Sequence, residues 1–260
     1  MKIASWNVNS LTVRLPHVLE WLARTQVDVL GLQELKMVDE KFPHAAFAEL
    51  GYECAAFGQK TYNGVALISK LPLQDVVRSN PHFADEHSRL IAATVNGVRI
   101  INGYFVNGQE PGSDKFAYKM RWLDGLQQYV AQELAAHPRL ALLGDFNITY
   151  DDRDTYDPIA LAETIHHTTE ERTHLQALLD AGLVDTFRCF EQAERSFSWW
   201  DYRDLAFRRK RGLRIDYVLA STALRADLQA CHIDVEPRKL ERPSDHAPVV
   251  AEFALPFATP

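Results

Sequence analysis

The chain has 260 residues, of which 47% are hydrophobic and 24% charged, so it can bury the core of one α/β domain or of two small ones. It has no run of the roughly 18 apolar residues that a membrane span needs, and its first residues lack the apolar segment of a signal peptide. The net charge of −7 does not by itself indicate a polyanionic partner, and three widely spaced cysteines argue against a disulfide framework, so we expect a reducing cytoplasm.

Strand and helix patterns alternate through the first half of the chain. An apolar strand is predicted at 2–6, and apolar residues spaced by three or four then predict a helix over 11–22. Further strands are predicted at 27–32, 64–69, 90–95 and 98–105. Asn96-Gly97 predicts a tight hairpin between the last two, because both central turn residues need positive φ.

The second half continues the alternation with longer helices. The spacing of apolar residues predicts an amphipathic helix over 115–135, which ends before Pro138. Thr168 and Glu171 fit a capping box that opens a helix to Gly182. Strands are predicted at 140–143, 197–202, 215–220, 233–235 and 249–253. Residues 148–167 form the longest irregular connection, which is unusual enough in a compact domain to suggest a function.

The strand patterns also predict how the elements pack. Several apolar strands lack a polar face, so they are covered on both sides, and hairpins mixed with crossover helices favour mixed sheets. We therefore expect an α/β sandwich of two mixed sheets packed face to face, with helices on the outside. Because no linker or repeat interrupts the pattern, residues 1–260 are expected to form a single domain.

Acidic residues and one histidine lie near the ends of several of the predicted strands. They are Glu34, Asp145, Asp216, Asp245 and His246. Each is ordinary turn or strand-end chemistry when taken alone. Together, carboxylates beyond buried strands with one histidine among them suit a hydrolytic Mg²⁺ site.

Individual roles follow from the residue types. Asp145 and Asn147 flank Phe146 and are expected to face the same side, where they suit holding and deprotonating a water. Glu34 is a hard oxygen ligand of the kind that Mg²⁺ takes. Asp216 can orient His246 and favour its imidazolium, which then donates to a phosphate oxygen.

Other candidates have two interpretations each. Asn7 and Asn9 flank Val8 and point the same way, as site residues or as turn residues. Tyr104 suits either the core or the site, and of Trp199 and Trp200 one is expected in the core and the other free to stack on a sugar or base. The basic run suits phosphates or a solvated loop; it comprises Arg208, Arg209, Lys210, Arg211 and Arg214.

Six motifs then occur in a fixed order: Trp6-Asn7-Val8-Asn9, Leu32-Gln33-Glu34, Asn102-Gly103-Tyr104, Gly144-Asp145-Phe146-Asn147, Gly212-Leu213-Arg214-Ile215-Asp216 and Ser244-Asp245-His246-Ala247-Pro248. In this combination the chain resembles the exonuclease III family, the DNA-repair branch of the endonuclease/exonuclease/phosphatase superfamily, over essentially its whole length. The resemblance implies a four-layered sandwich, dependence on Mg²⁺ with Mn²⁺ able to substitute, and hydrolysis of DNA phosphodiesters at 3′ termini and often at abasic sites.

The resemblance also implies roles for the residues in the matching motifs. Glu34 resembles the metal ligand, Asn7 lies beside it, and Asp245 resembles a residue that sits with the metal. Asp145 resembles the residue that activates or orients the water, and Asn147 supports it.

Tyr104 and His246 resemble the pair that binds the phosphate, and Asp216 resembles the partner that orients the histidine. Whether His246 acts as base or electrophile stays open; we favour the electrophile, with Asp145 as base. The residues expected to contact DNA are Asn9, Trp199, Leu213, Ile215, Arg211 and His167.

One loop departs from the family pattern. Relatives commonly have a Gly- and Phe-containing turn ending in Pro-x-Glu-Arg, whereas residues 165–172 here read Ile-His-His-Thr-Thr-Glu-Glu-Arg. One interpretation is a solvated loop. The other is that His166 or His167 narrows the space beside the phosphate, so that a frayed 3′ end enters and an internal abasic site does not.

We therefore expect a monomeric, cytoplasmic, Mg²⁺-dependent 3′-5′ exonuclease and 3′-end-processing enzyme, acting on duplex DNA with 3′ ends, nicks or abasic sites and on no membrane. A full abasic-site endonuclease of the same family is the alternative. Inositol-phosphate, sphingomyelin and DNase I-like phosphodiesterases share the core site, but the few cysteines and the 199–216 segment favour DNA repair. A non-catalytic DNA-binding relative would usually lack one of Glu34, Asp145, Asn147, Asp216 or His246, and all five are present.

Overall fold

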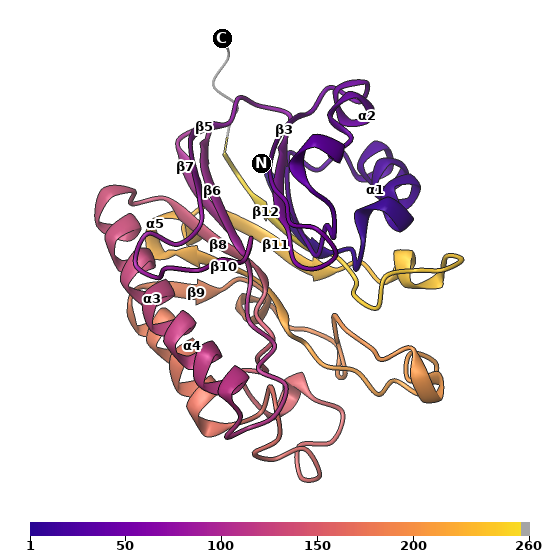
Figure 1. Ribbon diagram of the computed structural model, residues 1–260, viewed down its shortest axis with the longest axis vertical. Helices are drawn as coiled ribbons and strands as arrows, with labels where there is room; N and C mark the ends of the chain where they lie inside the picture. Colours follow the sequence, from indigo (N-terminus) through magenta and orange to yellow (C-terminus); the bar gives the residue numbers. More distant parts are fainter. Residues whose placement is uncertain (256–260) are drawn as a thin grey trace.

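Two mixed six-stranded β-sheets pack face to face in the computed structural model, which describes residues 1–255 (Figure 1). The first sheet contains, in spatial order, β11 (Leu228–Ile233), β12 (Val249–Phe253), β1 (Lys2–Asn7), β2 (Val29–Gln33), β4 (Val65–Ser69) and β3 (Glu53–Phe57). The second contains β5 (Gln74–Arg78), β6 (Leu90–Val95), β7 (Val98–Tyr104), β8 (Leu140–Asp145), β10 (Asp216–Ser221) and β9 (Leu183–Asp185).

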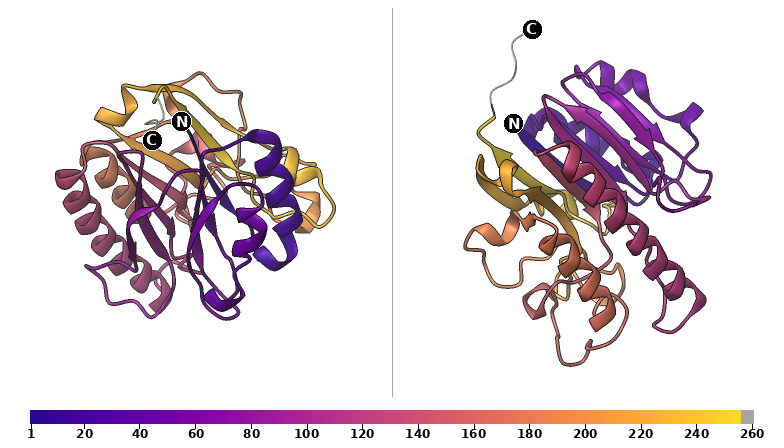
Figure 2. Two further views of the ribbon diagram at one scale, coloured as in Figure 1. Left: turned by 90° about the horizontal axis from the view of Figure 1, so that it is seen from above. Right: turned by 90° about the vertical axis from the view of Figure 1, so that its left-hand side faces the viewer.

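Helices cover the outer face of each sheet, which gives four layers (Figure 2). The helices are α1 (Leu11–Thr25), α2 (His44–Ala48), α3 (Asp114–Ala136), α4 (Thr169–Asp180) and α5 (Thr222–Arg225). Single turns of 3₁₀ helix lie at Asp39–Lys41, Asp152–Asp154, Phe187–Cys189, Arg203–Leu205 and Glu236–Lys239. Apolar residues of α1 and α2 pack on the first sheet, and those of α3 and α4 pack on the second. No helix of residues 1–255 is long and apolar enough to cross a bilayer.

The register of the sheets brings several strand ends to one place. β1 runs parallel to β2, and β7 runs parallel to β8. Tyr104 therefore lies opposite Asp145 at the ends of β7 and β8, and Asp216 pairs with Asp145 where β10 begins. Because a parallel pair ends at the same edge, the carboxyl ends of β7 and β8 collect polar side chains there, and the start of the antiparallel β10 adds Asp216.

A buried polar contact joins the two sheets below this edge. The Asn102 side-chain amide on β7 donates to the carbonyl oxygens of Leu32 (3.0 Å) and Ala66 (2.9 Å) in the other sheet. Its oxygen accepts from Gln33 Nε2 at 2.7 Å. Since buried polar groups are costly unless paired, these bonds favour a single position of one sheet against the other.

The structure confirms the predicted sandwich and the 96–97 hairpin, and both side-chain bonds of the Thr168–Glu171 capping box are present. The strand predicted at 197–202 is wrong, because that segment pairs only through isolated bridges of Trp199 to Leu213 and His246. The strand predicted at 233–235 is also wrong, since β11 ends at Ile233. The single-domain prediction includes residues 256–260, which lie outside the described part of the chain.

Candidate active site at the edge of the sandwich

Three possible metal ligands converge at the edge where β2 and β8 end. Glu34 follows β2, Asp145 ends β8, and His246 precedes β12. Each offers an atom, and these atoms all lie within 4.8 Å of one another. Asp145 and His246 are buried, whereas Glu34 is partly exposed. Segments far apart in the sequence thus share one acidic centre that solvent reaches from the Glu34 side.

Asn7 sets the positions of the two carboxylates. Its Nδ2 donates to Glu34 Oε1 and to Asp145 Oδ2, each at 2.9 Å, and its Oδ1 accepts from the Asn9 backbone N–H. On the outer side, Lys36 Nζ lies 3.0 Å from Glu34 Oε2. Both carboxylates are therefore oriented by charge-assisted hydrogen bonds, which are stronger than neutral ones.

His246 lies between two buried aspartates. Its Nδ1 is 2.9 and 3.1 Å from the two carboxylate oxygens of Asp216, and its Nε2 is 3.7 Å from Asp145 Oδ2. Burial alone would lower the pKa of His246, but the charges of Asp216 and Asp145 outweigh burial and raise this pKa to about 10. The ring is therefore an imidazolium at neutral pH, with Nδ1 donating to Asp216.

The turn after β8 gives Asp145 a fixed direction. Gly144 has φ +148°, and a Cβ placed on it would lie 1.9 Å from the carbonyl oxygen of Gly103, so only glycine fits. Asp145 Oδ1 accepts the backbone N–H of Asn147 at 3.0 Å, and Asn147 adopts φ +52°. Burial raises the pKa of Asp145 to about 7 against the opposing charge of His246. A carboxylate of this pKa suits a general base near neutral pH.

The side chain of Asn147 is hydrogen-bonded to other residues of the chain. Its Nδ2 donates to the carbonyl of Phe105 at 3.1 Å, and its Oδ1 accepts from Asn107 Nδ2 at 3.2 Å. Asn147 thus shows the turn chemistry that is the ordinary interpretation of an Asp-x-Asn motif. In this arrangement it orders the loop beside Asp145.

Tyr104 presents its hydroxyl to the same centre. Burial, followed by the charges of Glu34 and Asp145, raises its pKa well above the usual value. The Arg89 guanidinium lies 5.0 Å from the centre of the Tyr104 ring. The hydroxyl therefore stays protonated and can donate a hydrogen bond.

Asp245 lies on the other side of the centre and holds two neighbours. Its Oδ2 accepts from Trp199 Nε1 at 2.9 Å, and its Oδ1 accepts from Asn9 Nδ2 at 3.0 Å. The group of possible metal ligands found in residues 1–255 does not include it. In this structure Asp245 fixes the ring of Trp199.

A hollow of about 540 Å³ lies beside Trp199. Its walls include Trp199, Leu213, Arg211, His166 and His167. Ile215 does not line it: this residue is buried, and its backbone N–H is held by the Ser198 hydroxyl at 3.1 Å. The structure therefore brings four of the six expected DNA-contacting residues to one hollow. Of the other two, Asn9 is hydrogen-bonded to Asp245, and Ile215 is buried.

The two histidines of the atypical loop differ in accessibility. His166 is partly exposed, and its Nδ1 is 2.7 Å from the carbonyl oxygen of Asn147. His167 is only 4% exposed; its Nδ1 is 2.9 Å from the carbonyl oxygen of Ile165, and its Nε2 is buried without a protein partner. Both rings form part of the wall, so the loop is not simply solvated.

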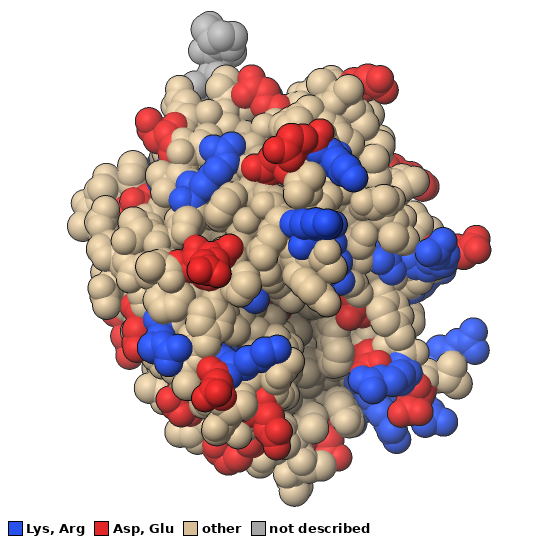
Figure 3. All heavy atoms as spheres, in the orientation of Figure 1, with Lys and Arg blue, Asp and Glu red and all other residues tan. Residues whose placement is uncertain are grey.

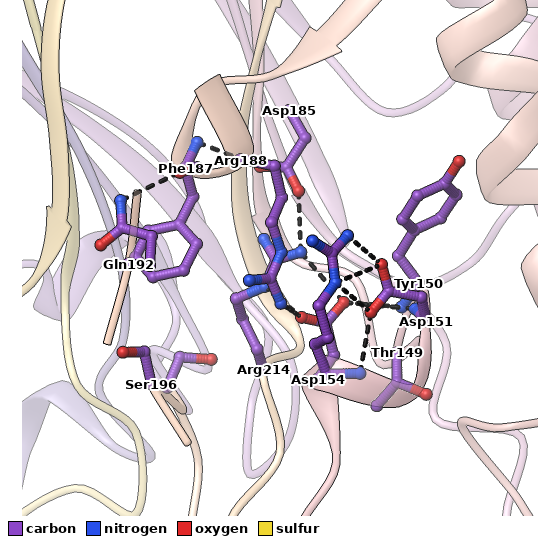
Figure 4. A network of polar contacts seen from close by, with 12 residues as sticks. Thr149, Tyr150, Asp151, Asp154, Asp185, Phe187, Arg188, Gln192, Ser196 and Arg214 are labelled. Atoms are coloured by element: carbon purple, nitrogen blue, oxygen red, sulfur yellow. Dashed lines mark hydrogen bonds and ion pairs between the residues drawn. The ribbon is translucent and has the colours of Figure 1, made fainter. Parts of the chain in front are cut away.

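The basic run divides in the folded chain. Arg208, Arg209, Lys210 and Arg211 are exposed, and Figure 3 shows this loop as a blue cluster at the lower right, beside a hollowed part of the surface. Arg214 is fully buried, so neither the phosphate-binding nor the solvated-loop interpretation of the basic run applies to it. It bonds to Asp154 at 2.7 and 2.9 Å and to Asp185 at 2.7 Å (Figure 4), which anchors the chain between Leu213 and Ile215.

The donor set fits a divalent cation. Glu34 and Asp145 offer hard oxygen atoms, and Mg²⁺ usually takes only one or two carboxylates and keeps several waters. Glu34 is the partly exposed one of the two, so it would hold the ion while Asn7 orients its carboxylate. Two buried acids beside a buried imidazolium also leave negative charge for a cation to neutralise.

Some residues of the site carry no individual signal in the sequence. Lys36, Asn107 and Ser198 lie outside the six motifs that the sequence offers. Lys36 and Asn107 each lie two or three residues from a recognised motif residue, and that proximity is the only sequence signal for them. Their partners are supplied by other segments of the chain.

Comparisons with known proteins identify the family to which the chain is similar. Residues 4–246 match the model of the Endonuclease/Exonuclease/phosphatase family. The exodeoxyribonuclease III of Haemophilus influenzae is 37% identical over 271 residues, covering 97% of this chain and 100% of that protein. A Neisseria 3′ phosphatase solved with a product DNA hairpin has a TM-score of 0.96 and 50% identity, covering 98% of this chain and 100% of the other. An AP endonuclease from Archaeoglobus fulgidus has a TM-score of 0.94 and 34% identity, with 98% and 100% covered.

Proposed function

Because the chain belongs to the endonuclease/exonuclease/phosphatase family, we propose that it is a Mg²⁺-dependent DNA-repair phosphodiesterase that acts on the 3′ ends of duplex DNA. The chain is an exonuclease-type enzyme by its relatives. The observation that carries the proposal is the buried Asp216–His246–Asp145 array beside Glu34. The backbone of Trp199, which lines the hollow of about 540 Å³, bridges to that of His246, so the hollow lies next to this array.

The proposed reaction is hydrolysis of the bond between phosphorus and a 3′ oxygen. Asp145 takes a proton from the attacking water, and its raised pKa of about 7 suits that role. The His246 imidazolium and the Tyr104 hydroxyl donate to phosphate oxygens as negative charge grows on them. A Mg²⁺ ion held by Glu34 would add positive charge to the same phosphate.

One bond-breaking step covers several substrates. Cleavage between phosphorus and the 3′ oxygen removes a terminal phosphate, releases a terminal nucleotide or cuts beside an abasic sugar. We propose that 3′-phosphatase and 3′-5′ exonuclease activities dominate. The resemblance at 50% identity to a Neisseria 3′ phosphatase supports this choice.

The substrate strand is proposed to place its 3′-terminal group in the hollow beside Trp199. Trp199 presents an aromatic ring and Arg211 a cation at this wall, and both suit a nucleotide. The exposed 208–211 loop would contact the phosphates of duplex DNA, since Lys and Arg supply most of the affinity for the backbone. The partner is therefore duplex DNA with 3′ ends or nicks, bound by a monomer.

Incision at internal abasic sites is proposed to be weak, because the rings of His166 and His167 occupy the wall where a flipped sugar would enter. Replacing His167 by Gly should raise incision of an abasic duplex at least about tenfold while 3′-phosphate release stays within about twofold. An unchanged ratio of abasic incision to 3′-phosphate release would contradict the proposal that the histidine rings restrict abasic substrates. Full abasic endonuclease activity is the second candidate, and it is favoured by the 34% identity to an archaeal AP endonuclease.

A gel assay on three duplexes tests the function. Blunt, 3′-phosphorylated and internally abasic duplexes are incubated with Mg²⁺, with and without EDTA, and Asp145→Asn serves as the inactive control. We expect fast 3′-phosphate release and exonuclease digestion, slow abasic incision and no cleavage in EDTA. Duplex binding without cleavage in Mg²⁺ would favour the non-catalytic DNA-binding relative instead. Activity that persists in EDTA would contradict the metal requirement.

A further inference from the structure

A completely buried lysine lies under the catalytic turn. Lys119 on α3 is 0% exposed, and its Nζ donates to the carbonyl oxygens of Asn147 (2.8 Å) and Asn107 (3.2 Å) and to Glu171 Oε1. Lysine is almost never fully buried unless it is paired. The fold therefore keeps a charge in its interior at a point that touches the turn carrying Asp145.

Glu171 on α4 connects this lysine to the histidine loop. Its Oε1 also accepts the backbone N–H of His166 at 3.1 Å. Its Oε2 accepts both the backbone N–H (3.1 Å) and the hydroxyl (2.8 Å) of Thr168. The ion pair thus connects the carbonyl of Asn147 to the turn formed by 166–168. The Nδ1 of His166, 2.7 Å from that same carbonyl, adds a second, direct link between the two turns.

Movement of this carbonyl would be transmitted to the catalytic carboxylate. Asn147 has a left-handed backbone with φ +52°, and its N–H holds Asp145 Oδ1 at 3.0 Å. The carbonyl and the N–H of Asn147 belong to neighbouring peptide units that meet at its Cα, so displacing the carbonyl shifts the residue whose N–H orients Asp145. A displacement of about 1 Å at a reacting group can cost on the order of 10²-fold in rate.

We propose that Lys119 and Glu171 are positioning residues that hold the Asp145–Asn147 turn against the 166–168 turn, so that the catalytic carboxylate and the wall of the hollow keep one geometry. This inference rests on the proposed function, because it assigns the pair to the same hydrolytic site. Neither side chain belongs to the group of possible metal ligands or lines the hollow. They act through the main chain of other residues.

The chain offers a matched control for a purely structural ion pair. Arg99 on β7 pairs with Glu133, which is also on α3, and both are nearly buried. Arg99 also contacts the Asp75 carbonyl and the Tyr129 hydroxyl, and none of these groups lies in the site. Arg99→Met therefore removes a buried pair from the same helix without touching the catalytic turn.

The experiment compares Lys119→Met, Glu171→Gln and Arg99→Met in steady-state release of phosphate from a 3′-phosphorylated duplex with Mg²⁺. All are assayed at a temperature where circular dichroism shows each to be folded. We expect Lys119→Met to lower kcat by about 10- to 100-fold with KM within about twofold. Arg99→Met should keep kcat within about twofold of the wild type, even if it lowers Tm as much as Lys119→Met does. Glu171→Gln should lose less kcat than Lys119→Met, because the lysine keeps its two carbonyl partners.

Other outcomes have definite meanings. The positioning role is overturned if Lys119→Met and Arg99→Met have equal kcat, or if Lys119→Met changes only KM. If Lys119→Met does not fold, the double variant Lys119→Met with Glu171→Gln removes both charges, which a buried site often tolerates, and the same loss of kcat is expected. If the wild type cleaves none of the blunt, 3′-phosphorylated and abasic duplexes, the proposed function fails, and the inference falls with it.

Discussion

The Asp216→Asn substitution tests the charge arrangement of the site most directly. Asp216 is 1% exposed, and both of its oxygens lie within 3.1 Å of His246 Nδ1. Asparagine keeps the size and the Ser198 contact to the backbone N–H, but it removes the negative charge. Because Asp216 is the largest charge contribution that raises the pKa of His246, we expect this pKa to fall well below about 10 in the variant.

The expected cost follows from the role of the imidazolium. A neutral ring loses the positive charge that strengthens the Nε2–H donor, and in the tautomer with its proton on Nδ1 it has no Nε2 proton to donate to the phosphate. Loss of one such donor typically lowers the rate by about 10²–10³-fold, or about 2.7–4 kcal/mol of barrier. The loss should appear mainly in kcat, because the donor acts more strongly in the transition state than on the bound substrate.

Two measurements check this. Single-turnover rates on a 3′-phosphorylated duplex give the chemical step, and NMR titration of the metal-free protein gives the pKa of His246. Asp28→Asn serves as the control. Asp28 is also a nearly buried aspartate (7% exposed), and it accepts the Lys2 N–H at 2.7 Å at the start of β1. The site lies at the other end of this strand, which carries Asn7. A loss below tenfold in Asp216→Asn, together with an unchanged pKa of His246, would refute the reasoning.

Three further predictions concern stability and DNA binding. Arg214→Met should lower the free energy of unfolding by about 3–5 kcal/mol, because it leaves Asp185 and part of Asp154 without their buried counter-ion; a urea titration showing less than about 1 kcal/mol would contradict this. Arg211→Ala should weaken duplex binding and reduce the slope of log K against log salt by about one, and an unchanged slope would place this side chain away from phosphates. Burial, then the charge of Lys119, lowers the pKa of His166 to about 3, whereas the unfolded chain takes up this proton below about 6.5. The folded state should therefore lose stability as pH falls from about 6 to about 4, and His166→Gln should flatten that dependence; parallel curves would count against a ring held neutral by the fold.

Local patterns were enough to predict most of the elements. The three- and four-residue spacing of apolar side chains predicted α1 and α3, and Asn96-Gly97 predicted the hairpin of β6 and β7. These signals work because helix periodicity and positive φ are properties of short segments. The aromatic segment at 197–202 misled for the same reason, since its residues favour strands but its backbone partners are isolated positions in other loops.

For the site, the sequence by itself determined which chemical groups are available: the acids, the single histidine among them and the glycine before Asp145. Only the tertiary structure decided which of these groups meet. It buried Arg214 in an ion pair with Asp154 instead of leaving it on the basic loop, and it turned Asp245 toward Trp199. It also placed Lys119, which no motif singles out, beneath the catalytic turn. The physical reason is that pairing, desolvation and pKa depend on distances between segments that sheet register and helix packing bring together, and no local pattern encodes those distances.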